Sequence, residues 1–187
     1  GGPVAVPSQD MVLGIYYLTQ ERPGAKGEGK FFKSVNEAIL AYENGVVTLH
    51  SRITVRMTKT MPDGTTLTGN VESTLGRFIF NEIIPQDLGF VDRSIPGNEL
   101  KLEVDFLVAK KQNKQILEKV INIHGATKTA EVLDAVKAMG YKYSTRAAMT
   151  VSISDMTVPP QKPQMIKDAQ DTVDPVSYTH LRAHETG

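Results

Sequence analysis

Apolar residues gather in short stretches along the chain, and their spacing predicts a mixture of helices and strands. The first stretch, residues 7–20, follows a capping Ser8 and carries apolar side chains on every side of a helix. A helix that is apolar all round must be buried on all sides. We therefore expect it to need neighbours beyond this chain, and the chain to be a piece of a larger protein.

The pattern that follows predicts a second helix and a small antiparallel hairpin. Ser34 and Glu37 form a capping box for a helix that ends at Asn44-Gly45. Residues 47–57 alternate apolar and polar, as a half-buried strand does. A Pro-Asp-Gly turn at 62–64 joins them to a Thr-rich partner strand at 65–71. The next apolar stretch, residues 75–84, predicts a helix capped by Thr74.

The second half of the chain is predicted to be mainly helical, which makes the fold α+β. Residues 86–98 are irregular, and the alternating residues 100–108 predict a strand. Amphipathic patterns predict one helix at 110–124 and another from Thr127, which either breaks at Gly140 or continues to 146. The pattern also predicts a short strand at 149–153 and a truncated C-terminal helix from 164–173.

The last residues, 176–187, differ from the rest of the chain. They have no periodicity and resemble translated sequencing-adaptor read-through. We expect an unstructured, non-native tail there. His180 and His184, although spaced like metal ligands on a helix, lie in this tail, so no metal site is expected from them.

Composition narrows the classes of function. The 187 residues balance 21 basic against 21 acidic side chains, which gives no overall attraction to nucleic acid or to a membrane. The absence of cysteine excludes disulfides and thiol catalysis and fits a cytoplasmic protein. The longest apolar run is far shorter than the roughly 20 residues that span a bilayer.

One stretch has nearly the spacing of a phosphate-binding loop. GAKGEGK at 24–30 places Gly24, Gly29 and Lys30 in register, but Phe31 stands where a Ser or Thr hydroxyl would bind Mg²⁺. A helix also precedes the loop, where the motif requires a strand. A solvated, flexible basic loop is the favoured interpretation, and a small nucleotide hydrolase is the alternative.

Four polar residues in apolar surroundings are candidates for a binding site. Gln9 and Asp10 stand at the start of the first helix, where free N–H groups favour an anion, although Asp10 can simply cap the helix. Arg77 and Arg146 lie within apolar or aromatic stretches. Each of these arginines needs a carboxylate, a phosphate or a water-filled channel beside it.

Six ordered blocks of sequence together resemble one family. They are PSQDMVLGIYYLT, AKGEGK, AYENGVVTLHSRI, STLGRFIFNEIIP, GATKTAEVLDAVKAMGYKYSTRAAMTVSISDM and VPPQK. They are similar to the largest, beta-prime, subunit of bacterial DNA-directed RNA polymerase over residues 3–173. The resemblance implies that residues 1–157 form the pore domain and that residues 158–175 begin the funnel, or rim, helix.

The resemblance also implies a role in transcription. The pore domain lines the secondary channel, which admits nucleoside triphosphates and takes up the 3′ end of backtracked RNA; Gln9, Asp10, Arg77 and Arg146 would lie toward it. The Mg²⁺ of this nucleotidyltransferase would be held by aspartates that precede the segment. We therefore expect neither a catalytic residue nor a metal ligand here, and no activity from the chain alone.

The partners implied by the resemblance are the beta, alpha, omega and sigma subunits, template DNA and RNA, and transcript-cleavage factors. A guanosine tetraphosphate site is not expected, because Thr127 and Ala138 stand where some relatives use a lysine and a tyrosine. A free-standing interaction module is a further alternative that the neutral, cysteine-free composition allows.

Overall fold

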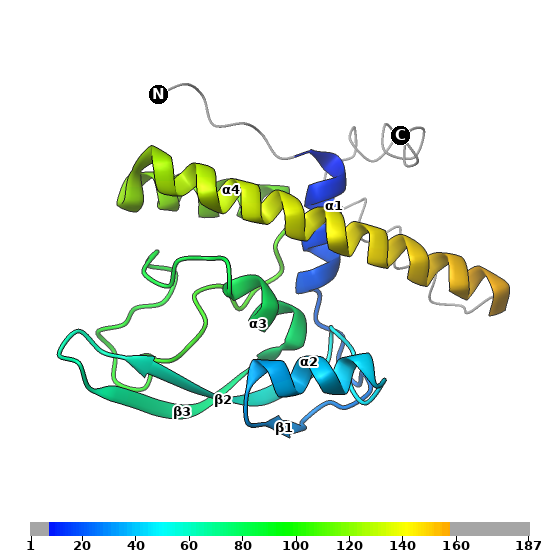
Figure 1. Cartoon of the computed structure of the whole chain (residues 1–187), viewed down its shortest axis with the longest axis horizontal. Coiled ribbons are helices and arrows are strands. Elements are labelled where there is room, and N and C mark those ends of the chain that lie inside the picture. Colours follow the sequence, from blue (N-terminus) through cyan, green and yellow to red (C-terminus); the bar gives the residue numbers. More distant parts are fainter. Residues whose placement is uncertain (1–7, 158–187) are drawn as a thin grey trace. The chain divides into compact units, whose positions relative to one another are not determined.

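The computed structural model describes residues 8–157, which form two compact units. The sheet unit is Thr19–Leu107, and the helical unit consists of the chain before Thr19 and after Leu107. Helices and one small sheet make the fold α+β, as predicted (Figure 1). The predicted helix at 164–173, the expected rim segment 158–175 and the expected tail 176–187 lie outside the described residues.

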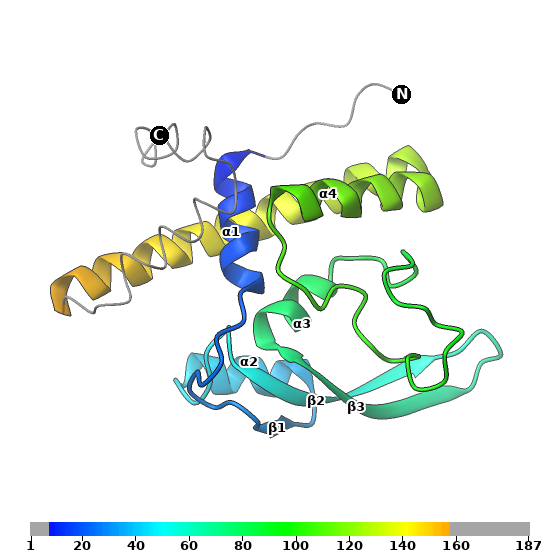
Figure 2. The ribbon, with the colours of Figure 1, turned by 180° about the vertical axis from the view of Figure 1, so that it is seen from behind.

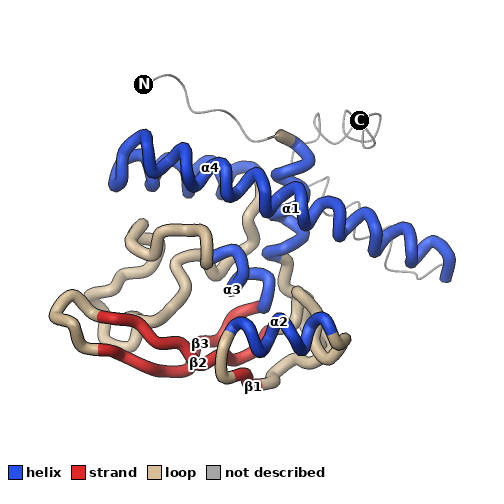
Figure 3. The backbone as a smooth tube through the Cα atoms, in the orientation of Figure 1, coloured by secondary structure: helices blue, strands red, loops and turns tan. Residues whose placement is uncertain are grey.

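The sheet unit is built on a β-hairpin. β2 (Arg52–Thr60) and β3 (Thr66–Thr74) pair antiparallel along their whole length, and a two-residue β1 (Phe31–Phe32) adds in parallel to the other side of β2 (Figure 3). Gly64 in the turn has a φ of 87°, a conformation that favours glycine. The predicted hairpin is confirmed, although residues 47–51 form turns rather than the start of the strand.

Helix α2 (Val35–Glu43) begins at the predicted Ser34 cap, but Glu37 bonds the N–H of Lys33 and not that of Ser34, as a capping box would require. The Ser34 hydroxyl accepts a hydrogen bond from the Glu37 N–H at 3.1 Å, and the Glu37 carboxylate accepts one from the Lys33 N–H at 2.5 Å. The Glu37 N–H, which the helix itself cannot satisfy, and the Lys33 N–H before the helix thus both have partners. The helix ends at Asn44, and Gly45 follows with a φ of 74°.

Helix α3 (Leu75–Asn81) lies at the centre of the sheet unit. It begins at Thr74, whose hydroxyl accepts a hydrogen bond from the Arg77 N–H at 3.2 Å, as the capping pattern predicted. All residues of the helix are buried, including the charged Arg77 and the polar Asn81. Because both side chains are buried, the surrounding fold has to supply hydrogen-bond partners for them.

The strand predicted at 100–108 was wrong, because other groups take up the backbone of this segment. The Asn81 amide donates to the Val104 carbonyl at 2.7 Å and accepts from the Val104 N–H at 3.0 Å. The Gln86 amide oxygen accepts from the Glu103 N–H at 3.0 Å. Side-chain amides thus occupy positions that a neighbouring strand would fill in a sheet.

In the helical unit, α1 (Gln9–Thr19) is buried as its pattern predicted. Met11, Val12, Ile15, Tyr16, Tyr17 and Leu18 are all buried, and Leu13 is half-buried. This burial occurs within the chain itself. The expectation that the covering neighbours must come from outside the chain was therefore wrong.

Helix α4 (Lys110–Thr157) consists of two arms that meet at Gly125. This residue has φ 84° and ψ 179°, which is not helical, and the chain reverses direction there (Figures 1 and 2). The first arm ends where the sequence predicted. The second arm continues through Gly140 without a break and includes residues 149–153, so the predicted strand at 149–153 was wrong. No helix among residues 8–157 has the length and apolar character needed to cross a membrane.

Candidate functional site

Gln9 and Asp10 occupy the first turn of α1, as predicted. The cap of this helix is Ser8, whose hydroxyl accepts a hydrogen bond from the Met11 N–H at 3.3 Å, while its carbonyl accepts one from Val12 at 3.0 Å. Asp10 is therefore a first-turn acid rather than the capping residue. Both Gln9 and Asp10 are half-buried, and both belong to the helical unit.

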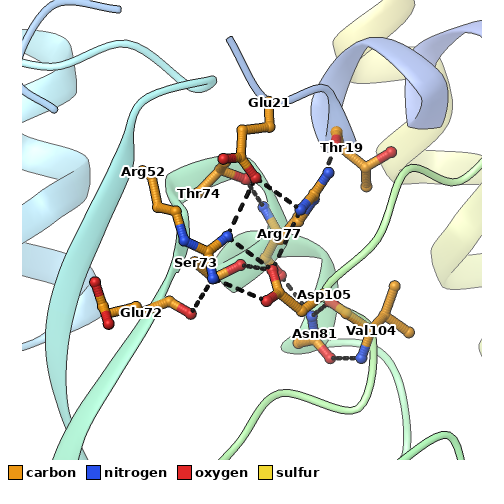
Figure 4. Close-up of polar contacts among 10 residues, drawn as sticks. All are labelled: Thr19, Glu21, Arg52, Glu72, Ser73, Thr74, Arg77, Asn81, Val104 and Asp105. Atoms are coloured by element: carbon orange, nitrogen blue, oxygen red, sulfur yellow. Dashed lines mark hydrogen bonds and ion pairs between the residues drawn. The ribbon is translucent and has the colours of Figure 1, made fainter. Parts of the chain in front are cut away.

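Arg77 is held by carboxylates of its own unit. Its guanidinium donates to Glu21 at 3.2 Å and to Asp105 at 3.3 Å, and its Nε donates to the Thr19 carbonyl at 2.9 Å (Figure 4). The side chain is only 8% exposed, so its charge needs these partners. Of the three environments expected for a buried arginine, the structure supplies the carboxylate.

Arg52 approaches the same two carboxylates from β2. It donates to Glu21 and to Asp105, each at 3.1 Å. Burial lowers the pKa of the Arg52 guanidinium, but the hydrogen bond and charge of Asp105, together with those of Glu21, outweigh burial and raise it. We call Thr19, Glu21, Arg52, Ser73, Arg77 and Asp105 the Arg77 cluster; in it, Ser73 donates to Asp105 at 2.6 Å (Figure 4).

The Arg77 cluster joins segments that are distant in sequence. Thr19 and Glu21 begin the sheet unit and Asp105 stands close to its end, while both arginines come from the elements between. Two cations thus bind two anions at the place where the chain enters and leaves the unit. This is the geometry of a structural ion-pair network, in which every charge has a partner.

Arg146 lies on the second arm of α4 and is half-buried. It belongs to the helical unit with Gln9 and Asp10, whereas Arg77 belongs to the sheet unit. Within the helical unit, α1 crosses the second arm of α4 where Met11 and Gly14 meet Gly140. Gln9 and Asp10 therefore stand beside a crossing on the same arm that carries Arg146.

The GAKGEGK loop does not have the form of a phosphate-binding loop. Its backbone N–H groups bond within the protein: Gly24 to the Glu28 carboxylate at 2.7 Å, Gly29 to the Arg52 carbonyl at 2.8 Å and Lys30 to the Gly27 carbonyl at 3.1 Å. Helix α1 precedes the loop, and a two-residue strand follows it. The nucleotide-hydrolase alternative is therefore not supported. The loop was expected to be flexible, but its backbone forms several hydrogen bonds within the protein.

Sequence reasoning missed Glu103, whose side chain is fully buried. Its carboxylate accepts hydrogen bonds from the Phe90 N–H at 2.5 Å and from the Arg93 guanidinium at 2.9 Å. Glu103 and Asp105 occupy the polar positions of the alternating residues 100–108, which a strand pattern assigns to solvent. In the structure Leu102, Glu103 and Val104 are buried one after another and Asp105 is exposed, so the alternation gave no signal for the burial of Glu103.

Among the residues that the structure describes, no three His, Cys, Asp or Glu side chains lie close enough together to hold a metal ion. Glu21 and Asp105, the two acidic residues that converge in the Arg77 cluster, are engaged by Arg52 and Arg77.

Comparison with known proteins identifies the family. A family model described as RNA polymerase Rpb1, domain 3, matches residues 1–156. The DNA-directed RNA polymerase subunit beta' of Lachnoclostridium phytofermentans is 66% identical, and that of Acetivibrio thermocellus 54%, each over 97% of this chain. The chain spans only 14% and 16% of the length of these two relatives. It therefore belongs to the RNA polymerase Rpb1 domain 3 family, as a segment of a bacterial RNA polymerase beta-prime subunit.

Proposed function

We propose that this chain is a non-catalytic part of a DNA-dependent RNA polymerase that lines the secondary channel, the route for incoming nucleoside triphosphates and for backtracked RNA. The observation that carries the proposal is the family match over residues 1–156, together with relatives named as subunits of DNA-directed RNA polymerase. The whole enzyme would be a nucleotidyltransferase. In it the chain would meet the beta, alpha, omega and sigma subunits, template DNA, RNA and transcript-cleavage factors.

The chain's contribution would be to shape and charge a passage rather than to carry out the chemistry. Arg77 and Arg52 are paired with Glu21 and Asp105 inside the sheet unit. Arg146 belongs to the helical unit, where it is half-buried on α4 and the exposed Lys142 stands one helical turn before it. Cations at this spacing share one face of a helix and attract the phosphates of a nucleotide.

The test is a set of substitutions in full-length beta-prime, assembled into polymerase. Arg146→Ala should raise the KM for nucleoside triphosphates about tenfold, the equivalent of roughly 1.4 kcal/mol, because a charged contact is lost. Lys114→Ala, an exposed lysine on the first arm of α4, is the matched control and should leave the KM unchanged. An unchanged KM and elongation rate in the Arg146 variant would show that Arg146 does not contact nucleotides in the channel.

The non-catalytic part of the proposal has its own test. The purified chain should not extend an RNA primer on a DNA template at any Mg²⁺ concentration, because residues 8–157 group no carboxylates that could hold the ion. Primer extension by the chain alone would contradict the proposal.

A further inference from the structure

Two glycines meet where α1 crosses the second arm of α4. Gly14 and Gly140 are both buried, and neither has a positive φ, so the backbone conformation does not require glycine at either position. Glycine is required because there is no room for a side chain at either position. A Cβ added to Gly140 would lie 2.6 Å from the Met11 carbonyl oxygen and 2.8 Å from the Met11 Cα. A Cβ added to Gly14 would overlap the Gly140 carbonyl.

Most of the atoms in the way are backbone atoms; the exception is the Met11 Cγ, 2.6 Å from the Cβ added to Gly140. A clash with the tip of a side chain is relieved by a change of rotamer, whereas a clash with a carbonyl is relieved only if one helix moves. Packed helices ordinarily lie about 8–10 Å apart, and a glycine inside a helix costs about 1 kcal/mol relative to alanine. Two glycines at one crossing therefore lower the intrinsic stability of both helices but let the helices approach each other more closely.

The crossing lies at a particular end of α1. Met11 and Gly14 belong to its first two turns, and Met11 donates its N–H to the capping Ser8. Gln9 and Asp10 directly precede the contact. Gly140 thus holds the N-terminal end of α1, where the predicted site residues stand, and does so from the arm that carries Arg146.

We propose that Gly140 is a positioning residue: with Gly14, it fixes the N-terminal turn of α1 against α4 and so sets the place of Gln9 and Asp10. The inference rests on the proposed function in one respect, because a displaced turn affects nucleotide addition only if α1 lines the channel that delivers nucleotides. The backbone contact itself does not depend on that function.

Gly140→Ala in full-length beta-prime, assembled into polymerase, tests the proposal by two measurements. Hydrogen exchange of the α1 amides should become at least about tenfold faster, because the first turn can no longer seat on α4. The kcat for nucleotide addition should fall by about ten- to a hundredfold with little change in KM, since displacements near 1 Å have effects of that size. A merely structural glycine would lower the yield of assembled enzyme without changing kcat.

The matched control is Gly69→Ala in β3. Gly69 also lacks a positive φ, but its added Cβ would meet only the tip of the Leu100 side chain, at 3.0 Å. This variant should leave both exchange in α1 and kcat unchanged. Unchanged exchange in the Gly140 variant would overturn the proposal. Faster exchange with unchanged kcat would instead overturn the placement of α1 along the secondary channel.

Should the Gly140 variant fail to assemble, the unmodified polymerase provides a second measurement. Two turns in backbone contact open together, so amides of residues 12–14 and 140–144 should have protection factors within about tenfold of each other. Exchange of the α1 turn that is far faster than that of residues 140–144 would contradict the proposal without any substitution.

Discussion

Arg77 and Arg52 bind the same two carboxylates but differ in exposure, and this difference decides what each contributes. The Arg77 side chain is 8% exposed and that of Arg52 is 35% exposed. Removing a buried side chain leaves a cavity and unsatisfied partners, whereas water can take the place of a side chain that is partly exposed. The stability of the Arg77 cluster should therefore depend on Arg77.

Arg77→Ala should lower the free energy of unfolding by about 3 kcal/mol, because it leaves a cavity and deprives the buried Thr19 carbonyl of its donor. Arg52→Ala, which leaves Arg77 in place, should cost less than about 1 kcal/mol. Urea unfolding of the purified chain measures both values. Equal losses would show that exposure does not separate the two arginines.

Asp63 offers a pH-dependent test in the hairpin turn. The Thr65 hydroxyl, which donates to the Asp63 carboxylate at 2.6 Å, lowers the pKa of Asp63 below its ordinary 3.8, and the Thr65 N–H adds to the effect. Since the folded pKa is the lower one, the interaction stabilises the turn above pH 3.8 and is lost as the pH falls through the folded pKa.

Thr65→Ala should therefore raise the pKa of Asp63 toward 3.8, as measured by NMR titration of its carboxylate. Asp92, whose pKa the Ser94 hydroxyl lowers in the same way, is an internal control in the same spectrum and should not move. An Asp63 pKa that stays low in the variant would assign the shift to another group.

At the scale of elements, periodicity and capping chemistry predicted most of the fold. Ser34 and Thr74 capped the predicted helices, and the Pro-Asp-Gly turn formed the hairpin. The alternation at 100–108 led to a wrong prediction. A repeat of two residues indicates an extended chain, but an extended chain becomes a strand only when it pairs with a neighbour. That neighbour would be distant in sequence, and here Asn81 and Gln86 fill its place.

Asn81→Leu should therefore unfold this segment selectively. It leaves the Val104 N–H and carbonyl without the Asn81 amide, at a cost of about 3 kcal/mol for buried polar groups. Hydrogen exchange at Val104 should accelerate accordingly. Asn70→Leu, at an exposed position of β3, is the control and should change stability by less than about 0.5 kcal/mol.

The candidate site was predictable only in part. Its residue types and the N-terminal placement of Gln9 and Asp10 followed from the pattern, and so did the need of Arg77 for a counter-charge. The sequence did not reveal that Glu21 and Asp105 are the partners of Arg77, because both are distant from it in sequence. The close approach at Gly140 was also missed, since a glycine inside a helical pattern indicates a possible break as readily as a crossing.

At the scale of the whole molecule, the chain leaves the helical unit after Leu18 and returns at Val108. The sheet unit between these points is continuous, has its own core and contains every member of the Arg77 cluster. The helical unit is discontinuous, because α1 and α4 come from opposite sides of the insertion. The two units should therefore differ in their ability to fold alone.

Residues 19–107 expressed alone should fold, giving a dispersed NMR spectrum and a cooperative thermal transition. Residues 108–157 alone lack α1, which Gly140 contacts, and should not melt cooperatively. A disordered 19–107 fragment would contradict this division of the chain.

The Arg77 cluster also has a mechanical consequence. A pull transmitted along the polypeptide from α1 to α4 would load the bridge between Glu21, Arg77 and Asp105 before it reached the strands. Tension would therefore act on these ion pairs first and on the hairpin only after they break. Rupture of a few ion pairs, rather than unzipping of β2 from β3, would set the force at which the unit first yields.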